Sequence, residues 1–269
     1  MKSYKRALTI AGSDPSGGAG LQADLKTFSA LGCYGMSAVV AVVDENTVGV
    51  TGVHPVPAEF VVGQIRSVLD DIGTDAVKIG MLHSSELIRA VKETLGSYRI
   101  GNTVLDPVMV ATSGDPLLCD DAAATLRDEL IPSVRVITPN IPEAEILLGR
   151  KIESQDELPD AARELSFGRR VSVLLKAGHL HDEQLTDILY DAETDTLLSL
   201  RSARLATRNT HGTGCTLSSA LAAYLAHGLP LDEAAVRAKE YISQAIAAGA
   251  RYDIGHGHGP VHHFFGFWE

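Results

Sequence analysis

The sequence is poor in cysteine. Its three cysteines, Cys33, Cys119 and Cys215, lie far apart, and their number is odd. None belongs to a pair spaced for zinc binding or redox exchange. We therefore expect neither a disulfide framework nor a zinc module.

Basic charge and long apolar runs are also lacking. The chain has 23 Lys and Arg residues against 34 Asp and Glu residues, a formal net charge of −11. Surfaces that bind nucleic acid or anionic membranes depend on clustered Lys and Arg, and no such cluster is present. No run of 18 apolar residues is available to cross a bilayer, and the N-terminal residues lead straight into a short apolar stretch. We expect a soluble, cytoplasmic protein with neither a nucleic-acid nor a membrane partner.

What is present is enough apolar sequence for a sizeable core, with 45% apolar residues in a chain of 269. Short apolar runs alternate with helical periodicity, which favours crossover connections and a mostly parallel sheet with helices on both faces. The closely spaced apolar runs of residues 171–199 predict hairpins at one sheet edge. We expect a single α/β domain over residues 1–269. The predicted strands are 7–11, 36–43, 76–79, 103–105 and 135–138, and the predicted helices are 21–31, 60–69, 86–95, 215–226 and 231–248.

Two glycine-containing segments are candidate anion sites. The first, residues 12–20, follows a predicted strand, opens a predicted helix and matches neither common nucleotide-binding glycine motif. A tight turn alone is the other interpretation. The second, residues 209–216, contains Gly212, Thr213 and Gly214 directly before an apolar helix, where unpaired N–H groups can face a transferring phosphoryl group.

Cys215 stands at the start of that helix. The helix dipole would stabilise its thiolate and lower its pKa, making it a candidate base. Burial as a small apolar side chain is the alternative.

Polar residues mark several predicted strand ends, where open parallel sheets bind ligands. Asp106 ends one strand, and Asn140 and Glu143 follow another. Their carboxylates suit Mg²⁺ carried by nucleotide phosphates, although capping and turn roles are equally compatible. Lys176 and Lys239 are candidates to neutralise phosphate charge, against the default of surface lysines.

Six segments, GSDPSGGAGLQADLKTF, LDPVM, TPNIPEAE, KAGH, NTHGTGCTLSSALAA and GPVHHF, together resemble the hydroxymethylpyrimidine/phosphomethylpyrimidine kinases of thiamine biosynthesis, from about residue 7 to about residue 265. The resemblance implies a ribokinase-like αβα sandwich, ATP as co-substrate, Mg²⁺, and a homodimer with its active sites near the subunit contact.

The resemblance also implies roles for individual residues. Around the pyrimidine it places Gly12, Asp24, Glu45, Met81 and Val108. At the reacting end it implies a catalytic Cys215, an anion hole of Gly212, Thr213 and Gly214, Mg²⁺ organised by Asp106 and Glu143, and Lys176, Lys239, Asn140 and Thr213 facing the nucleotide. From the residues alone, Asp24 has the pattern of a solvated helical residue, and nothing marks Glu45 or Met81.

The chain departs from the family pattern at Glu45, where the family usually has Gln. An ionised Glu only accepts hydrogen bonds, whereas Gln also donates. Glu45 can accept from a pyrimidine 4-amino group and would penalise a ligand that offers only acceptors. A milder departure is KAGH in place of KGGH.

We therefore predict a kinase that phosphorylates 4-amino-5-hydroxymethyl-2-methylpyrimidine and then its monophosphate, with Cys215 taking or directing the hydroxyl proton. A pyridoxine or pyridoxal kinase is the alternative enzyme. A ligand-binding sensor that has lost catalysis is the alternative from another class.

Overall fold

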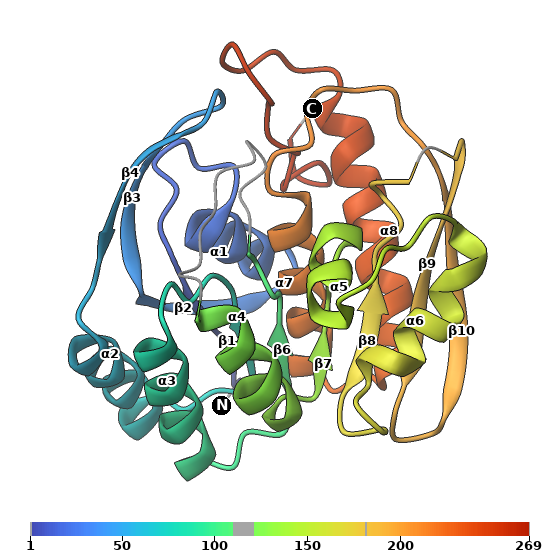
Figure 1. Cartoon of the computed structure of the whole chain (residues 1–269). Coiled ribbons are helices and arrows are strands. Elements are labelled where there is room, and N and C mark those ends of the chain that lie inside the picture. Colours follow the sequence, from blue (N-terminus) through green and yellow to red (C-terminus); the bar gives the residue numbers. More distant parts are fainter. Residues whose placement is uncertain (1, 110–120, 181, 269) are drawn as a thin grey trace.

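The computed structural model describes residues 2–109, 121–180 and 182–268. Its main sheet has eight strands in the order β10-β9-β8-β7-β6-β5-β1-β2, and β3 and β4 form a separate antiparallel ribbon (Figure 1). From β2 to β8 neighbouring strands are parallel, whereas β9 and β10 add an antiparallel edge. The strands are β1 (Lys5–Ala11), β2 (Cys33–Val39), β3 (Ala41–Glu45), β4 (Val50–Pro55), β5 (Ala76–Ile79), β6 (Thr103–Leu105), β7 (Val136–Ile137), β8 (Ser172–Leu175), β9 (Gln184–Asp191) and β10 (Thr196–Ala203).

Helices cover both faces of the main sheet. Alternate residues of one strand serve the two sides: Leu8 and Ile10 join one apolar core, and Ala7 joins the other. Helices α1, α7 and α8 contribute to the core of Ala7, while α2, α3, α5 and α6 contribute to the opposite core (Figure 1). The helices are α1 (Gly20–Ala30), α2 (Ala58–Asp71), α3 (Ser85–Ser97), α4 (Ala122–Thr125), α5 (Ile141–Leu148), α6 (Leu158–Leu165), α7 (Thr213–Ala226) and α8 (Leu231–Gly249), with short turns η1 (Leu126–Leu130), η2 (Ile131–Ser133) and η3 (Gln155–Glu157).

The expected αβα sandwich with a mostly parallel sheet is confirmed. Strands β5 and β6 occupy the predicted ranges, and every residue of β5 is buried, as a strand covered by helices on both faces requires. The hairpin predicted at a sheet edge is the β9–β10 pair. None of the helices in the described ranges has the length and apolar character needed to span a membrane.

One predicted strand is wrong. Residues 36–43 were expected to form one strand, but the chain leaves the main sheet at Val40, whose N–H still bonds to the Ala11 carbonyl at 3.0 Å. Beyond that residue β3 pairs with β4 alone, with an irregular register at Asp44 and Glu45. Apolar periodicity cannot show this change because it reports burial and not the identity of the pairing partner.

The cysteines that can be placed are unpaired. Cys33 and Cys215 are free thiols, and Cys119 lies outside the described residues.

Candidate active site

Asp106 and Lys176 form a buried ion pair where β6 and β8 end. The Lys176 Nζ lies 3.0 Å from the Asp106 Oδ1, which also accepts a hydrogen bond from the Thr138 hydroxyl at 2.9 Å. Although burial acts in the opposite direction, Lys176, Lys78 and Thr138 hold the pKa of Asp106 below its ordinary value. The site thus contains a carboxylate and an ammonium that both stay charged.

Glu143 interacts electrostatically with both members of this pair, but its pKa shifts in the opposite direction from that of Asp106. It belongs to a capping box at the start of α5, where its Oε2 accepts from the Asn140 N–H at 2.8 Å and the Asn140 side chain accepts from the Glu143 N–H. Burial raises the pKa of Glu143 to about 7, with Asp106 acting in the same direction and Lys176 opposing. The capping role considered for Glu143 is therefore real, and it orients a second carboxylate beside Asp106.

The start of α7 brings backbone N–H groups to the same place. Gly212 has a φ of +75°, in the left-handed region, and a Cβ added there would lie 1.8 Å from the Gly18 carbonyl oxygen. A Cβ on Gly214 would lie 3.3 Å from the Lys176 Nζ and 3.4 Å from the Asp106 Oδ2. The predicted nest thus adjoins the Asp106–Lys176 pair, but its N–H groups are not all unpaired as expected, since that of Thr213 donates to the Thr210 carbonyl at 3.3 Å.

Cys215 corrects one expectation. Burial raises the pKa of its thiol to about 11, with Asp24 and Asp106 acting the same way and Lys78 opposing. The predicted lowering is wrong because it counted only the helix dipole, whereas burial and two carboxylates outweigh it. The raised pKa favours the neutral thiol form of Cys215, whose side chain is partly buried.

Asp24 of α1 is buried against β1, β5 and α7. Its carboxylate has no exposed surface and accepts hydrogen bonds from Lys78 at 2.9 Å, Thr9 at 2.6 Å and Ser219 at 2.6 Å. The prediction of a solvated residue on a helix is therefore wrong. Because the carboxylate is buried, Asp24 can influence a ligand only through these partners. The sequence analysis missed Lys78, which is also fully buried; its signal is a lysine inside the apolar strand AVKI.

Gly12 and Met81 meet at the ends of β1 and β5. A Cβ on Gly12 would lie 3.1 Å from the Met81 Cε and 3.7 Å from the Val43 Cγ2 of β3. Val108 is half-buried against the same apolar core, and Glu45 ends β3. Gly12 and Met81, which the resemblance placed around the pyrimidine, thus lie together.

His211 and Asp14 were missed by the sequence analysis. The His211 Nε2 lies 2.9 Å from the Asp14 Oδ2 and 3.9 Å from the Glu45 Oε1. Asp14 also accepts from the N–H groups of Ser16, Gly18 and Ala19. The only sequence signal was the polar character of the two loops, because the two residues are 197 positions apart.

Lys239 forms an ion pair of its own, distinct from the Asp106–Lys176 pair. Its Nζ pairs with the Asp187 Oδ2 of β9 at 2.6 Å, and the Asp187 Oδ1 accepts from the Ala177 N–H at 2.8 Å. The surface default for Lys239 is wrong, since its side chain is 14% exposed. Through Asp187, Lys239 fixes the segment that follows Lys176.

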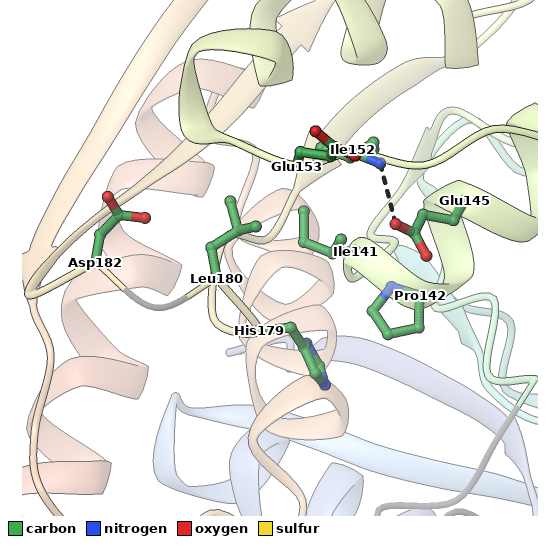
Figure 2. A pocket seen from close by; sticks show the side chains of 8 residues that line it. All are labelled: Ile141, Pro142, Glu145, Ile152, Glu153, His179, Leu180 and Asp182. Atoms are coloured by element: carbon green, nitrogen blue, oxygen red, sulfur yellow. Dashed lines mark hydrogen bonds between the residues drawn. The ribbon is translucent and has the colours of Figure 1, made fainter.

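A pocket of about 860 Å³ opens beside this segment, between the start of α5 on one side and His179, Leu180 and Asp182 on the other (Figure 2). Its lining combines apolar side chains with carboxylates, one of which, Glu145, accepts from the Ile152 N–H at 3.0 Å. Carboxylates disfavour phosphate, so the positive charge of Lys176 makes the α7 side the better place for phosphates. The lining residues are Ile141, Pro142, Glu145, Ile152, Glu153, His179, Leu180 and Asp182.

Known proteins resemble the chain over almost its whole length. The family model described as phosphomethylpyrimidine kinase matches residues 14–262. The hydroxymethylpyrimidine/phosphomethylpyrimidine kinase of Rhizobium meliloti is 51% identical over 98% of both chains, and that of Escherichia coli is 49% identical over 97% of this chain and 98% of the relative.

Solved structures agree with the fold. The crystal structure of phosphomethylpyrimidine kinase from Clostridium difficile superposes with a TM-score of 0.78 at 43% identity, covering 90% of this chain and 99% of that chain. The pyridoxal kinase from Staphylococcus aureus in complex with ADP gives 0.89 at 35% identity, covering 99% and 96%. These matches confirm the ribokinase-like architecture, and the extent of the sequence identity shows that the chain belongs to the phosphomethylpyrimidine kinase family.

Proposed function

We propose that the chain is an ATP-dependent kinase of thiamine biosynthesis that phosphorylates 4-amino-5-hydroxymethyl-2-methylpyrimidine and then its monophosphate. Relatives carrying this activity in their names match it at about half identity over nearly their full length. The observation that carries the proposal is the convergence of Gly214, Lys176 and Asp106 at the start of α7. Membership of a kinase family disfavours the non-catalytic sensor.

The phosphoryl group is transferred at this convergence. The substrate hydroxyl oxygen attacks the γ-phosphorus, the bond from that phosphorus to the β,γ-bridging oxygen breaks, and ADP leaves. Lys176 and the N–H groups of Gly212 and Gly214 stabilise charge on the transferring oxygens, since positioning and electrostatics supply most of this catalysis. The Thr213 N–H joins them when it is released from the Thr210 carbonyl.

Cys215 directs the attacking hydroxyl. Its thiol keeps its proton at neutral pH, so it orients the hydroxyl by hydrogen bonding until the proton becomes acidic late in transfer. A loose transition state requires little early deprotonation of the nucleophile. The proton then passes to a neighbouring acceptor or to solvent.

Asp106 and Glu143 suit Mg²⁺. Two buried carboxylates, one of which raises the pKa of the other, form a place where a cation relieves repulsion. Among the described residues no group of three or more His, Cys, Asp and Glu forms a metal cage, which agrees with an ion held largely by nucleotide phosphates. When bound, Mg²⁺ neutralises phosphate charge.

The remaining nucleotide contacts come from Asn140, Thr213 and Lys239. Asn140 and Thr213 start α5 and α7, where helix N-termini favour anions. Lys239 supports the segment after Lys176 through Asp187 and adds positive charge.

The pyrimidine lies on the other side of the transferred group, against Gly12, Met81 and Val108, with Glu45 accepting from its 4-amino group. The close approach of Gly12 and Met81 supports this arrangement. Asp24 acts indirectly, by accepting hydrogen bonds from Lys78 of β5 and from Ser219 of α7.

The kinase acts as a homodimer. Large apolar side chains are exposed on the β3–β4 ribbon and on α2, with Val42 at 55%, Val53 at 42% and Phe60 at 65%. Exposed apolar side chains of this size suit an interface, and β3 carries Glu45 at its end. A cytoplasmic location and a single domain over residues 1–269 complete the proposal, based on composition and on the continuous main sheet.

Pyridoxal kinase activity is the second candidate. The observation that favours it is the TM-score of 0.89 with the Staphylococcus aureus pyridoxal kinase. The lower sequence identity of that protein, 35% against 51% for the Rhizobium meliloti relative, keeps the pyrimidine first.

An ATP-coupled assay tests the proposal. It compares 4-amino-5-hydroxymethyl-2-methylpyrimidine, its monophosphate and pyridoxal at matched concentrations. Turnover of both pyrimidines with little on pyridoxal supports the proposal. A preference for pyridoxal replaces it with the second candidate, and no turnover on any of the three contradicts both.

A further inference from the structure

A buried histidine joins the two glycine loops of the site. Asp14 belongs to the loop after β1, and His211 to the loop before α7; the two residues are 1% and 4% exposed. The contact of the His211 Nε2 with the Asp14 Oδ2, at 2.9 Å, is the side-chain bond between these loops. None of the chemistry described above uses it.

The orientation of the imidazole follows from its partner. Asp14 accepts from three backbone N–H groups and from His211, and although burial acts against it, these bonds hold the pKa of Asp14 well below its ordinary range. An ionised carboxylate only accepts hydrogen bonds, so the His211 Nε2 must carry the proton. The imidazole therefore acts as a fixed donor.

The loop backbones leave no room for adjustment at this place. A Cβ on Gly18 would lie 2.4 Å from the His211 Cδ2, and one on Gly212 would lie 1.8 Å from the Gly18 carbonyl oxygen. His211 also donates its own N–H to the Gly259 carbonyl at 3.0 Å, which ties it to the C-terminal segment. A shift of the His211 ring would move the first loop and Gly212 together.

The ring also faces the substrate side. The Glu45 Oε1 of β3 lies 3.9 Å from the same Nε2. One imidazole is thus close to the glycine loop, to the residue assigned to the pyrimidine amino group, and to the nest for the transferring phosphate.

We propose that His211, held by Asp14, is a positioning residue that sets the distance between the substrate alcohol and the phosphoryl-binding nest. The proposal rests on the proposed function. His211 touches neither reacting atom; it fixes the loop that carries Gly212 against the loop that starts at Gly12. Misplacement by about 1 Å costs on the order of 100-fold in rate, so the effect should fall on kcat.

The test compares His211→Leu with His211→Gln in the full-length protein. Leu removes the donor, whereas the Gln amide lies where Nε2 lies and can donate to Asp14. We expect His211→Leu to lower kcat about 100-fold while changing KM for pyrimidine and ATP by less than about threefold, and His211→Gln to recover most of the loss. His227→Leu is the matched control, because His227 is a part-buried histidine at the other end of α7 whose Nε2 contacts the Leu31 carbonyl at 2.8 Å.

The outcomes separate the two proposals. A kcat for His211→Leu near the wild-type value, a loss confined to KM, a Gln variant no better than Leu, or an equal loss in His227→Leu would each overturn the role of His211. A wild type that phosphorylates only pyridoxal removes the pyrimidine assignment, and the same kcat comparison on pyridoxal then decides the role of His211. A wild type inactive on every alcohol removes both proposals.

Discussion

The two ends of the site are built differently. The phosphoryl end, Asp106, Lys176, Glu143 and residues 212–214, lies directly after β6 and β8 and at the starts of α5 and α7, with its charged side chains largely buried. The pyrimidine end, Gly12, Glu45, Met81 and Val108, includes the β3–β4 ribbon outside that sheet and has mainly apolar contacts. The difference supports a division within the proposed mechanism, in which the phosphoryl end carries out transfer to an alcohol and the pyrimidine end selects the alcohol.

This division also fits the comparisons. The Staphylococcus aureus pyridoxal kinase shares the fold at a TM-score of 0.89 while differing at about two thirds of aligned positions, given 35% identity. A fixed phosphoryl end with a variable substrate end allows such divergence. Changes at the first end should therefore lower kcat for every substrate, and changes at the second should alter selectivity.

The largest expected effect is at the phosphoryl end, in Lys176→Met. It removes the ammonium 3.0 Å from Asp106 and next to Gly214 while keeping most of the side-chain volume. We expect kcat to fall about 1000-fold on pyrimidine and pyridoxal alike, as for other lost transition-state donors. Steady-state kinetics on both alcohols measure it.

The control for that variant is Lys151→Met, which removes a lysine whose side chain is 80% exposed and which pairs with Glu145. It should leave kcat within about twofold, since surface ion pairs contribute little. A Lys176→Met loss restricted to one of the two alcohols would contradict the division between the two ends.

The second prediction concerns stability and pH at Glu143. Its folded pKa, about 7, lies above the ordinary value of 4.5, so the folded state binds the proton more tightly than the unfolded chain. The resulting stabilisation is present below pH 4.5 and is lost as the pH rises toward 7. In EDTA, wild type should lose on the order of 3 kcal/mol between pH 4 and 8 relative to Glu143→Gln, measured by urea unfolding.

A second capping box supplies the control for Glu143. Glu157→Gln alters the equivalent residue of the box formed with Ser154, at a position 39% exposed. That variant keeps the buried Glu143 and should therefore show the wild-type loss of stability between pH 4 and 8. If the free energy of unfolding of Glu143→Gln and of wild type changed in parallel with pH, burial beside Asp106 would not raise the pKa of Glu143. The cation-binding role proposed for Asp106 and Glu143 would then lose its support.

Third in size is Cys215→Ala. A thiol that directs the hydroxyl without acting as a strong base should contribute about 10- to 100-fold to kcat, at or below the lower end of the range for groups that assist proton transfer. The variant should keep its KM values. Because the pKa of the thiol is raised to about 11, the rate at which iodoacetamide alkylates Cys215 in the wild-type protein should rise steadily from pH 7 to 10 without a plateau.

A different result would reassign the cysteine. An alkylation rate that levels off near pH 7 would show a thiolate at physiological pH and restore Cys215 as a base. Turnover of Cys215→Ala equal to wild type would remove the thiol from the mechanism.

How far the sequence predicts the site depends on whether a feature is local or joins segments that are distant in the sequence. Strand ends and the nest were predictable, because Asp106, Lys176 and Gly214 follow local patterns at elements whose ranges the apolar runs mark. The Asp14–His211 and Asp24–Lys78 pairs were not, because each joins residues distant in sequence whose local patterns are those of a turn, a loop, a helix or a strand. The prediction for the pKa of Cys215 was wrong for the same reason, because the carboxylates and the burial that raise this pKa come from other elements.

The smallest expected effect belongs to the pyrimidine end, in Glu45→Gln. The ionised carboxylate accepts from a pyrimidine amino group but repels the phenolate oxygen of pyridoxal, whereas Gln can donate to that oxygen. One exchanged hydrogen bond is worth about 1 kcal/mol, so kcat/KM for pyridoxal relative to the pyrimidine should rise about fivefold. Competition between the two alcohols in one reaction measures the ratio directly, and Glu59→Gln on α2 is the surface control. An unchanged ratio, or an equal fall in kcat for both alcohols, would mean that Glu45 acts on phosphoryl transfer and that the two ends are less separate than their construction indicates.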